Sequence, residues 1–213
     1  MQLPGIRAVQ RENAMDLMRQ VAIQMIARGG YNAMTLAEVG ELAGYSRGLA
    51  THHFGSKAGL LNSVLDTILE TNAQEFRKAT EGRRGRDRLA AVVDSALYRC
   101  VQTPDQARAY LMLALEPTAK WAASRIKDQT SRLRKEAEDA AREAIALEEL
   151  SPELDPADVA SIVSAMARGY AYEWAADPHT DLTAARRRIG AFIAALPGAA
   201  PSRGRRKVSQ TRR

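Results

Sequence analysis

The sequence has a single cysteine, Cys100, among its 213 residues. One thiol excludes an intrachain disulfide, which is typical of proteins of the reducing cytoplasm. The residues around it, among them Val93 and Leu97, follow an apolar helical pattern, so a packed core or pocket thiol is favoured over a catalytic one. The first residues lack the apolar stretch of a signal peptide, and the expected location is therefore cytoplasmic.

Long hydrophobic runs are also absent, and aromatic residues make up only 5% of the chain. No run reaches the roughly 18 apolar residues of a membrane-spanning helix, so we expect no membrane partner. No segment alternates Val, Ile or Thr with polar residues as strands do. Alanine, leucine, glutamate and arginine are abundant instead and favour helices. The sequence therefore predicts an all-α fold of about nine helices.

Glycines and capping residues divide the N-terminal part into short helices. A long first helix is expected to end at the glycines 29–30, and Thr35 with Glu38 forms a capping box for the second. The other boundaries predicted here are Gly44, Ser46, Gly55 and Ser56. Beyond residue 86 the pattern predicts longer helices over 87–102, 103–116, 118–149, 157–176 and 181–196. Thr103 and Gln106 are the expected capping box of the second of these.

Charge is concentrated at the two ends of the chain. Residues 201–213 carry six basic residues and no acidic one, which equals the whole net charge of +6. Residues 1–57 have a net charge of +2, and residues 58–196 have a net charge of −2. This split indicates an N-terminal part that faces nucleic acid and a body with another role. The segment 197–213 is expected to be disordered, either adding non-specific DNA affinity or only keeping the protein in solution.

The stretch SRGLATHHFGSK, residues 46–57, gathers hydrogen-bond donors without any acidic residue. His52 and His53 are neighbours, so on a helix they point about 100° apart and do not share a metal ion easily. A nucleophilic serine would need a nearby carboxylate, which the stretch lacks. We therefore expect no metal, no cofactor and no catalysis here.

A helix-turn-helix explains more of this stretch. Two short helices joined at Gly44 would pack through apolar residues and leave Arg47, Gly48, Thr51 and His52 facing outward. Arg47 suits a guanine edge or a phosphate, and Gly48 allows close approach to DNA. Lys57, in the first turn of the fourth helix, suits a phosphate. A solvated polar face on a helical hairpin is the simpler alternative.

Residues 35–61 resemble the helix-turn-helix of the tetracycline-repressor (TetR) family of bacterial regulators. The matching positions are Thr35, Val39, Ala43, Gly44, Ser46, Gly48, His53, Phe54, Ser56, Lys57, Leu60 and Leu61. The resemblance implies DNA contacts at Thr35, Arg47, Thr51, His53 and Lys57. Together with the outward residues, the predicted DNA-binding set is Thr35, Ser46, Arg47, Gly48, Thr51, His52, His53 and Lys57. The family usually has tyrosine in place of Thr51 and a larger aliphatic residue in place of Ala50.

The last two predicted helices carry apolar stripes at the spacing of a helix-packing seam. The residues predicted to form a dimer interface are Val159, Ile162, Val163, Met166, Tyr170, Leu182, Ile189 and Phe192. Packing of both stripes within their own domain is the alternative. The resemblance favours the homodimer, because TetR-like proteins pair these two helices of each subunit into a four-helix interface.

The resemblance also implies a pocket for a small-molecule effector among the central helices. Candidate lining residues are Tyr98, Cys100, Tyr110, Met112, Leu115 and Trp121, although such residues often belong to a plain core. Few aromatic residues and few charges that look buried favour a fairly apolar effector.

These expectations combine into one hypothesis. Residues 1–56 would be the helix-turn-helix domain, with its motif at about 35–54, residues 57–196 the effector-binding and dimerisation domain, and 197–213 a basic tail. The protein would be a ligand-responsive transcriptional regulator, a repressor rather than an activator, on a near-palindromic operator. A non-specific architectural DNA-binding protein is the main alternative. We do not expect an enzyme, because residues 86–196 show no cluster of acid and base groups.

Overall fold

The computed structural model describes residues 6–30, 32, 34–116 and 120–199. This part of the chain contains nine α-helices and no strand, which confirms the all-α prediction. The helices are α1 (Ile6–Gly29), α2 (Leu36–Leu42), α3 (Arg47–Phe54), α4 (Lys57–Thr80), α5 (Gly85–Gln102), α6 (Pro104–Leu115), α7 (Lys120–Ala146), α8 (Pro156–Ala176) and α9 (Leu182–Ala195).

The N-terminal boundaries follow local capping chemistry. The amide of Glu38 donates to the Thr35 hydroxyl at 3.2 Å, and the Glu38 carboxylate accepts from the Thr35 amide at 3.0 Å, so the predicted capping box is present. Gly44, with φ +81°, follows α2 in the left-handed conformation that glycine adopts without strain. Ser56 caps α4 by accepting from the Gly59 amide at 3.1 Å. These boundary predictions are confirmed.

Two capping predictions do not hold as stated. Ser46 precedes α3, but its side chain makes no capping hydrogen bond. The capping box at Thr103 and Gln106 is wrong, because the Thr103 hydroxyl donates backwards to the Arg99 carbonyl at 3.2 Å. The Gln106 side-chain oxygen is buried without a partner among the described residues. Pro104 nevertheless begins α6 at the position where its missing N–H costs least.

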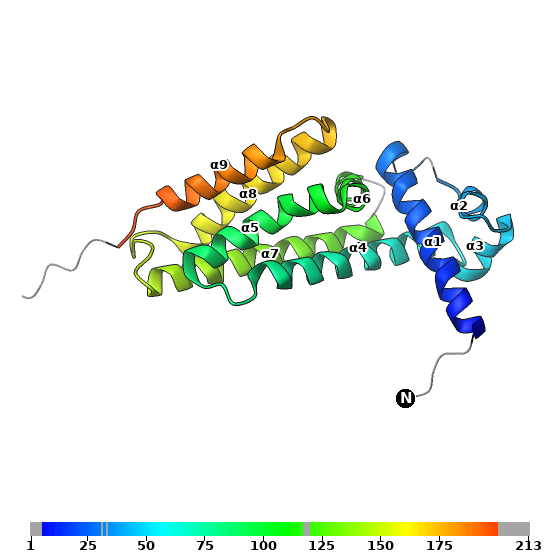
Figure 1. Cartoon of the computed structure of the whole chain (residues 1–213), viewed down its shortest axis with the longest axis horizontal. Coiled ribbons are helices and arrows are strands. Elements are labelled where there is room, and N and C mark those ends of the chain that lie inside the picture. Colours follow the sequence, from blue (N-terminus) through cyan, green and yellow to red (C-terminus); the bar gives the residue numbers. More distant parts are fainter. Residues whose placement is uncertain (1–5, 31, 33, 117–119, 200–213) are drawn as a thin grey trace, which may run out of the picture.

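The molecule is elongated, with α1, α2 and α3 at one end and α5, α7, α8 and α9 in the body (Figure 1). One core joins the N-terminal helices to the first half of α4 and to one face of α6, and its members include Met18, Val39, Leu61, Ala109 and Leu113. A second core fills the body between α5, α7, α8 and α9. Because α4 and α6 contribute to the N-terminal core while belonging to the body, both connect the two ends.

The structure tests the expected absence of a membrane-spanning helix and the expected disorder of the C-terminal tail only over the described residues. In the described ranges, none of the helices combines the length and the apolar character that crossing a membrane requires. The Pro197 carbonyl accepts from the Ser151 amide at 2.8 Å, so the chain is held against the body just after α9. The predicted disorder of the basic tail falls mostly on residues 200–213, which lie outside the described residues.

Candidate nucleic-acid interface and ligand cavity

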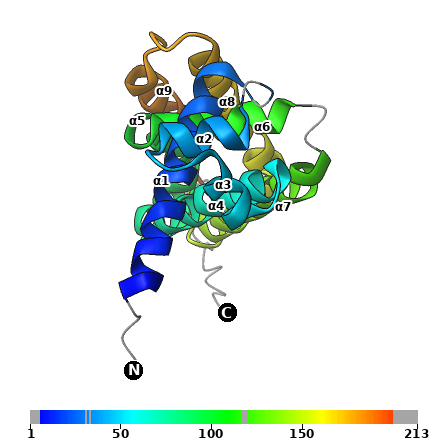
Figure 2. The ribbon, with the colours of Figure 1, turned by 90° about the vertical axis from the view of Figure 1, so that its right-hand side faces the viewer.

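Helices α2 and α3 form a compact pair at the end of the molecule, where they lie in front of α1 and α4 (Figure 2). Val39 of α2 and Ala50 of α3 are fully buried between them and α1. The Tyr45 amide donates to the Gly40 carbonyl at 2.9 Å across the turn. The pair has the arrangement of a helix-turn-helix, with α3 as the helix that presents its outer face.

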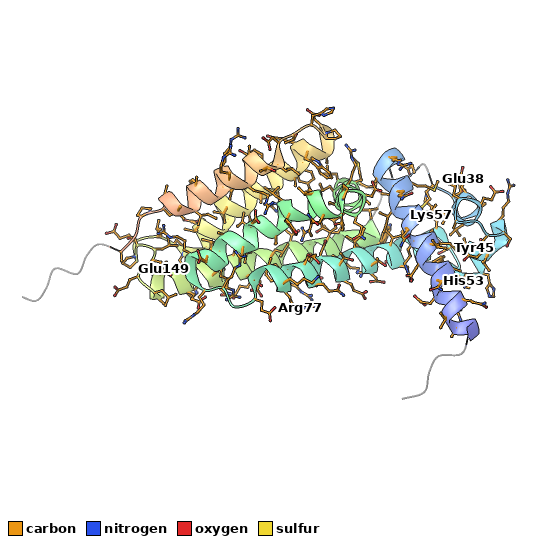
Figure 3. The ribbon with its side chains drawn as sticks, in the orientation of Figure 1. Glu38, Tyr45, His53, Lys57, Arg77 and Glu149 are labelled. Carbon is orange, nitrogen blue, oxygen red and sulfur yellow. The ribbon has the colours of Figure 1, made fainter. Side chains whose placement is uncertain are left out.

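The predicted DNA-binding residues gather at this end. Figure 3 shows His53 and Lys57 there beside Tyr45 and Glu38, while Glu149 lies at the opposite end of the body. Two of the eight, His53 and Lys57, are half-buried, and the six exposed ones are Thr35, Ser46, Arg47, Gly48, Thr51 and His52. Positions 47, 48, 51 and 52 recur at three- and four-residue intervals, so they share one face of α3.

Arg47 is the most prominent cation on this face, with its side chain 74% exposed. Its guanidinium forms an ion pair with Glu41 of α2, and the hydrogen bond to that carboxylate raises the pKa of Arg47. The pair lies in water and is weak, so a phosphate or a guanine edge can replace Glu41. Sequence reasoning did not identify Glu41 as a competitor for Arg47.

The surroundings of Thr35 and His53 affect how each could contact DNA. The Thr35 hydroxyl donates to the Glu38 carboxylate at 2.7 Å, so in this state its proton serves the capping box. Burial lowers the pKa of His53, and the positive charges of Arg11 and His52 lower it further. The ring is therefore neutral at pH 7, and its Nδ1 atom is buried without a partner in the described part of the chain.

Lys57 is the first residue of α4, directly after the Ser56 cap. A helix of this length carries a partial positive charge at its N-terminus, which favours an anion there. The same end of the molecule therefore presents an arginine, a lysine and a helix N-terminus. We find no group of three His, Cys, Asp or Glu residues in the described ranges that could hold a metal ion.

The body contains a cavity of about 150 Å³ between α5, α6, α7 and α8. Of the six predicted pocket residues, Cys100 and Tyr110 line it. The other four lie elsewhere: Tyr98 under the Arg186 guanidinium, Met112 and Trp121 against the N-terminal core, and Leu115 exposed at the end of α6. The helical pattern of these residues is compatible both with the cavity wall and with another position in the protein. The packing of the helices determines which of the two each residue occupies.

Polar residues that sequence reasoning missed also line this cavity. They are Arg99, Thr130, Arg134, Ser164, Arg168 and Tyr172. The expectation of a fairly apolar effector rested on the scarcity of buried charges, and Arg99 removes that basis. Its signal in the sequence was weak, because an arginine next to Cys100 on an amphipathic helix ordinarily reaches solvent.

Cys100 is an inert thiol in this environment. Burial raises its pKa to about 11, since the thiolate loses its hydration there. At pH 8 we expect alkylation roughly 200-fold slower than that of an exposed thiol with a pKa of about 8.5. Mass spectrometry of iodoacetamide-treated protein measures the rate, which should rise about tenfold per pH unit and reach the free-thiol rate in denaturant. A native rate equal to that of free cysteine would contradict the buried position.

The α8 and α9 stripes divide between the core and the surface. Val159, Val163, Leu182 and Ile189 are buried in the subunit's own core, so these four side chains are not available to a partner. Packing against α5 and between α8 and α9 takes up this face. Ile162 and Phe192 remain exposed, at 51% and 37%, and Met166 and Tyr170 are half-buried. Exposed small residues lie near them in the sequence, namely Ser161, Ala165, Gly169, Ala191 and Ala195, and the exposed Asp158 and Arg188 lie one helical turn before Ile162 and Phe192.

The described residues thus combine an exposed helix-turn-helix with a helical body that contains a cavity. The family model described as "Bacterial regulatory proteins, tetR family" matches residues 19–64. Residues 19–64 thus match the DNA-binding domain of the TetR family, which confirms the resemblance of residues 35–61.

Curated relatives are similar over the same region. The HTH-type transcriptional regulator BetI of Stenotrophomonas maltophilia is 35% identical over 92 residues, covering 42% of this chain and 45% of that protein. BetI of Burkholderia lata is 31% identical over 91 residues, with the same coverage. The chain thus matches less than half of the length of these relatives.

Solved structures share the fold over nearly the whole chain. A TetR transcriptional regulator of Chloroflexus aurantiacus is 19% identical, with a TM-score of 0.78, covering 90% of this chain and all of that one. A regulator of Saccharomonospora viridis solved in complex with choline is 18% identical, with a TM-score of 0.72, covering 85% and 96%. At these identities the likeness establishes the fold alone.

Proposed function

We propose that this protein is a ligand-responsive transcriptional regulator that binds a near-palindromic operator as a homodimer and represses until an effector releases it. One observation carries the proposal: α3 presents Arg47, Gly48, Thr51 and His52 on one solvent-facing side at the tip of the molecule. A helix placed in this way fits the major groove, while α1 and α4 support it from behind.

Dimerisation is supported by the outer face of α8 and α9. Ile162 and Phe192 are large apolar side chains in water, and the small residues Ala165 and Ala195, one turn after them, allow two helices to approach closely. The face lies on the body, away from α3 (Figure 1). A two-fold axis here would leave both recognition helices open to half-sites about one helical turn, roughly 34 Å, apart.

Effector control is supported by the position of α6. Tyr110 and Ala114 line the cavity, while Ala109 and Leu113 on the same helix pack in the N-terminal core against α1. An occupant that displaces α6 therefore moves the helix on which α2 and α3 are packed. The choline bound by the S. viridis protein is a cation, and three arginines without a carboxylate line the cavity described here. We do not propose choline as the effector of this chain.

Selection of bound fragments from random duplex DNA, at about physiological salt, tests the DNA-binding part. We expect a palindromic consensus whose half-site centres are separated by one helical turn. Uniform recovery of all sequences at every salt concentration would refute specific recognition and would favour an architectural DNA-binding protein.

Lys57 is predicted to contact a phosphate. Lys57→Ala should weaken binding to all sequences alike and should lower the slope of log affinity against log salt by about 1 per half-site, because one fewer counterion is released. Fluorescence anisotropy over a salt series measures the slope. Lys78→Ala, at the other end of α4 and paired with Glu75, is the matched control and should leave the slope unchanged. A loss confined to one sequence would contradict the phosphate role.

A further inference from the structure

We propose that the cavity binds a small organic anion, an aromatic or short-chain carboxylic acid whose carboxylate pairs with Arg99. This inference rests on the proposed function only for its regulatory consequence, since the binding site itself is argued from the cavity. It adds a negative charge to the fairly apolar effector that the sequence predicts.

The first argument is the state of Arg99. Its Nη1 atom is buried and has no hydrogen-bond partner in the described part of the chain. Burial lowers the pKa of Arg99, and the groups near enough to act on it electrostatically are Tyr110 and Cys100. Arginine nevertheless stays protonated in proteins, so a charged and half-buried guanidinium lines the cavity with one buried N–H group that has no acceptor. A buried donor without an acceptor is unfavourable, and an anionic ligand that accepts from Nη1 removes that cost.

The second argument is the sign of the remaining charges. Arg134 of α7 and Arg168 of α8 also line the cavity, and both are exposed at its edge. Among the residues described around this cavity there is no aspartate or glutamate, and neither arginine takes part in an ion pair with a described residue. Three guanidinium groups that approach one space from α5, α7 and α8 attract an anion and repel a cation.

The third argument is the size and the lining of the space. Apart from its cations and a few hydroxyls, the wall is apolar, with Val92, Val93, Leu111, Ile126 and Leu133. Its volume is about 150 Å³, and an engineered apolar cavity of about that volume holds a benzene molecule. The Tyr110 phenol and the Thr130 hydroxyl add polar contacts beside the charged end. The site therefore fits a compact hydrocarbon body with one acidic group.

The direct test compares matched probes that differ in charge. Benzoate, benzamide and benzyltrimethylammonium share an aromatic ring, and pentanoate with pentanamide forms a short-chain aliphatic pair. Isothermal titration calorimetry should show that at least one acid binds about tenfold or more tightly than its amide, as expected for a charge-assisted hydrogen bond. Amides or the ammonium probe binding as well as the acids would overturn the proposal, and so would no binding of either acid at about 10 mM.

Substitution of Arg99 gives a second, independent readout. Arg99→Met should abolish the preference for the acid, and it should also raise the melting temperature of the ligand-free protein by about 2 °C or more, because a buried donor without an acceptor is removed. A purely structural arginine would show the opposite thermal effect, which would contradict a ligand-binding role. Arg132→Gln, on α7 outside the cavity, is the control and should change neither measurement.

The experiments distinguish a failure of the anion-binding proposal from a failure of the proposed regulator function. Operator binding is measured by anisotropy with and without the acid that binds best. Acid binding without any DNA binding would sustain the anion site and refute the proposed regulator. Specific DNA binding with no affinity for the acids would sustain the regulator and refute the anion site.

Discussion

Replacing Ile162 and Phe192 together by aspartate is expected to convert a dimer into a monomer and to lower operator affinity by about 10²- to 10⁴-fold. Affinity falls by about this factor when two linked DNA-binding units become independent. Both side chains are exposed on the outer face of α8 and α9, so the subunit itself should still fold. In a two-fold interface each substitution occurs twice, and four carboxylates would be brought together out of water.

Sedimentation equilibrium at about 10 µM gives the mass, and anisotropy on the selected operator gives the affinity. Val101→Asp is the matched control, because Val101 is an exposed apolar residue on α5, outside α8 and α9. It should leave both the mass and the affinity unchanged. A double variant that remains dimeric with full affinity would place the interface on another surface.

The contrast between Val163 and Ile162 shows how far the sequence predicts this interface. Both follow the apolar pattern of α8, yet Val163 is fully buried in the subunit and Ile162 is half exposed. Periodicity marks the apolar residues of a helix, but it does not say whether a neighbouring helix of the same subunit or a partner covers them. Burial within the subunit distinguishes the residues that fill its own core from those that stay exposed. The exposed residues, Ile162 and Phe192, are therefore the candidate dimer contacts.

Local signals, in contrast, predicted the helix-turn-helix closely. The Thr35 and Glu38 capping box, the glycine at 44 and the Ser56 cap each act within four residues, so their effects do not depend on distant packing. Thr103 resembles Thr35 in the sequence, but its hydroxyl is taken by the preceding turn of α5. The hydroxyl of a residue between two helices can bond either to the last turn of the preceding helix or to the first turn of the following one. The sequence alone does not show which bond forms.

The cavity could not be predicted for a related reason. The apolar pattern predicts Cys100 and Tyr110 as lining residues, and both line the cavity, but it does not point to Arg99, which with Arg134 and Arg168 gives the cavity its charge. Arginine on a helix usually extends its end into water. Arg99 instead lines the cavity between α5, α6, α7 and α8, where its Nη1 atom is buried. Such a position depends on contacts between helices that are far apart in the chain.

Arg47→Ala is expected to lower affinity for the selected operator by about 5- to 150-fold per half-site and to relax the preference at one base position. Arg47 is the first residue of α3 and lies on its exposed face. A bidentate contact from its guanidinium to guanine would account for a preference of this size over the other bases. Anisotropy on the operator, and on operators altered at single positions in both half-sites, measures the loss and its position dependence at one fixed salt concentration.

Glu41→Gln tests the same residue from the opposite direction. The carboxylate of Glu41 holds the Arg47 guanidinium in the free protein, so its removal should release Arg47 and strengthen binding to the operator. The gain should disappear when Arg47 is alanine, because the two substitutions act through one side chain. If Glu41→Gln improved affinity equally in both backgrounds, the gain would come from lower repulsion of phosphates, and Arg47 would not be the residue that Glu41 restrains.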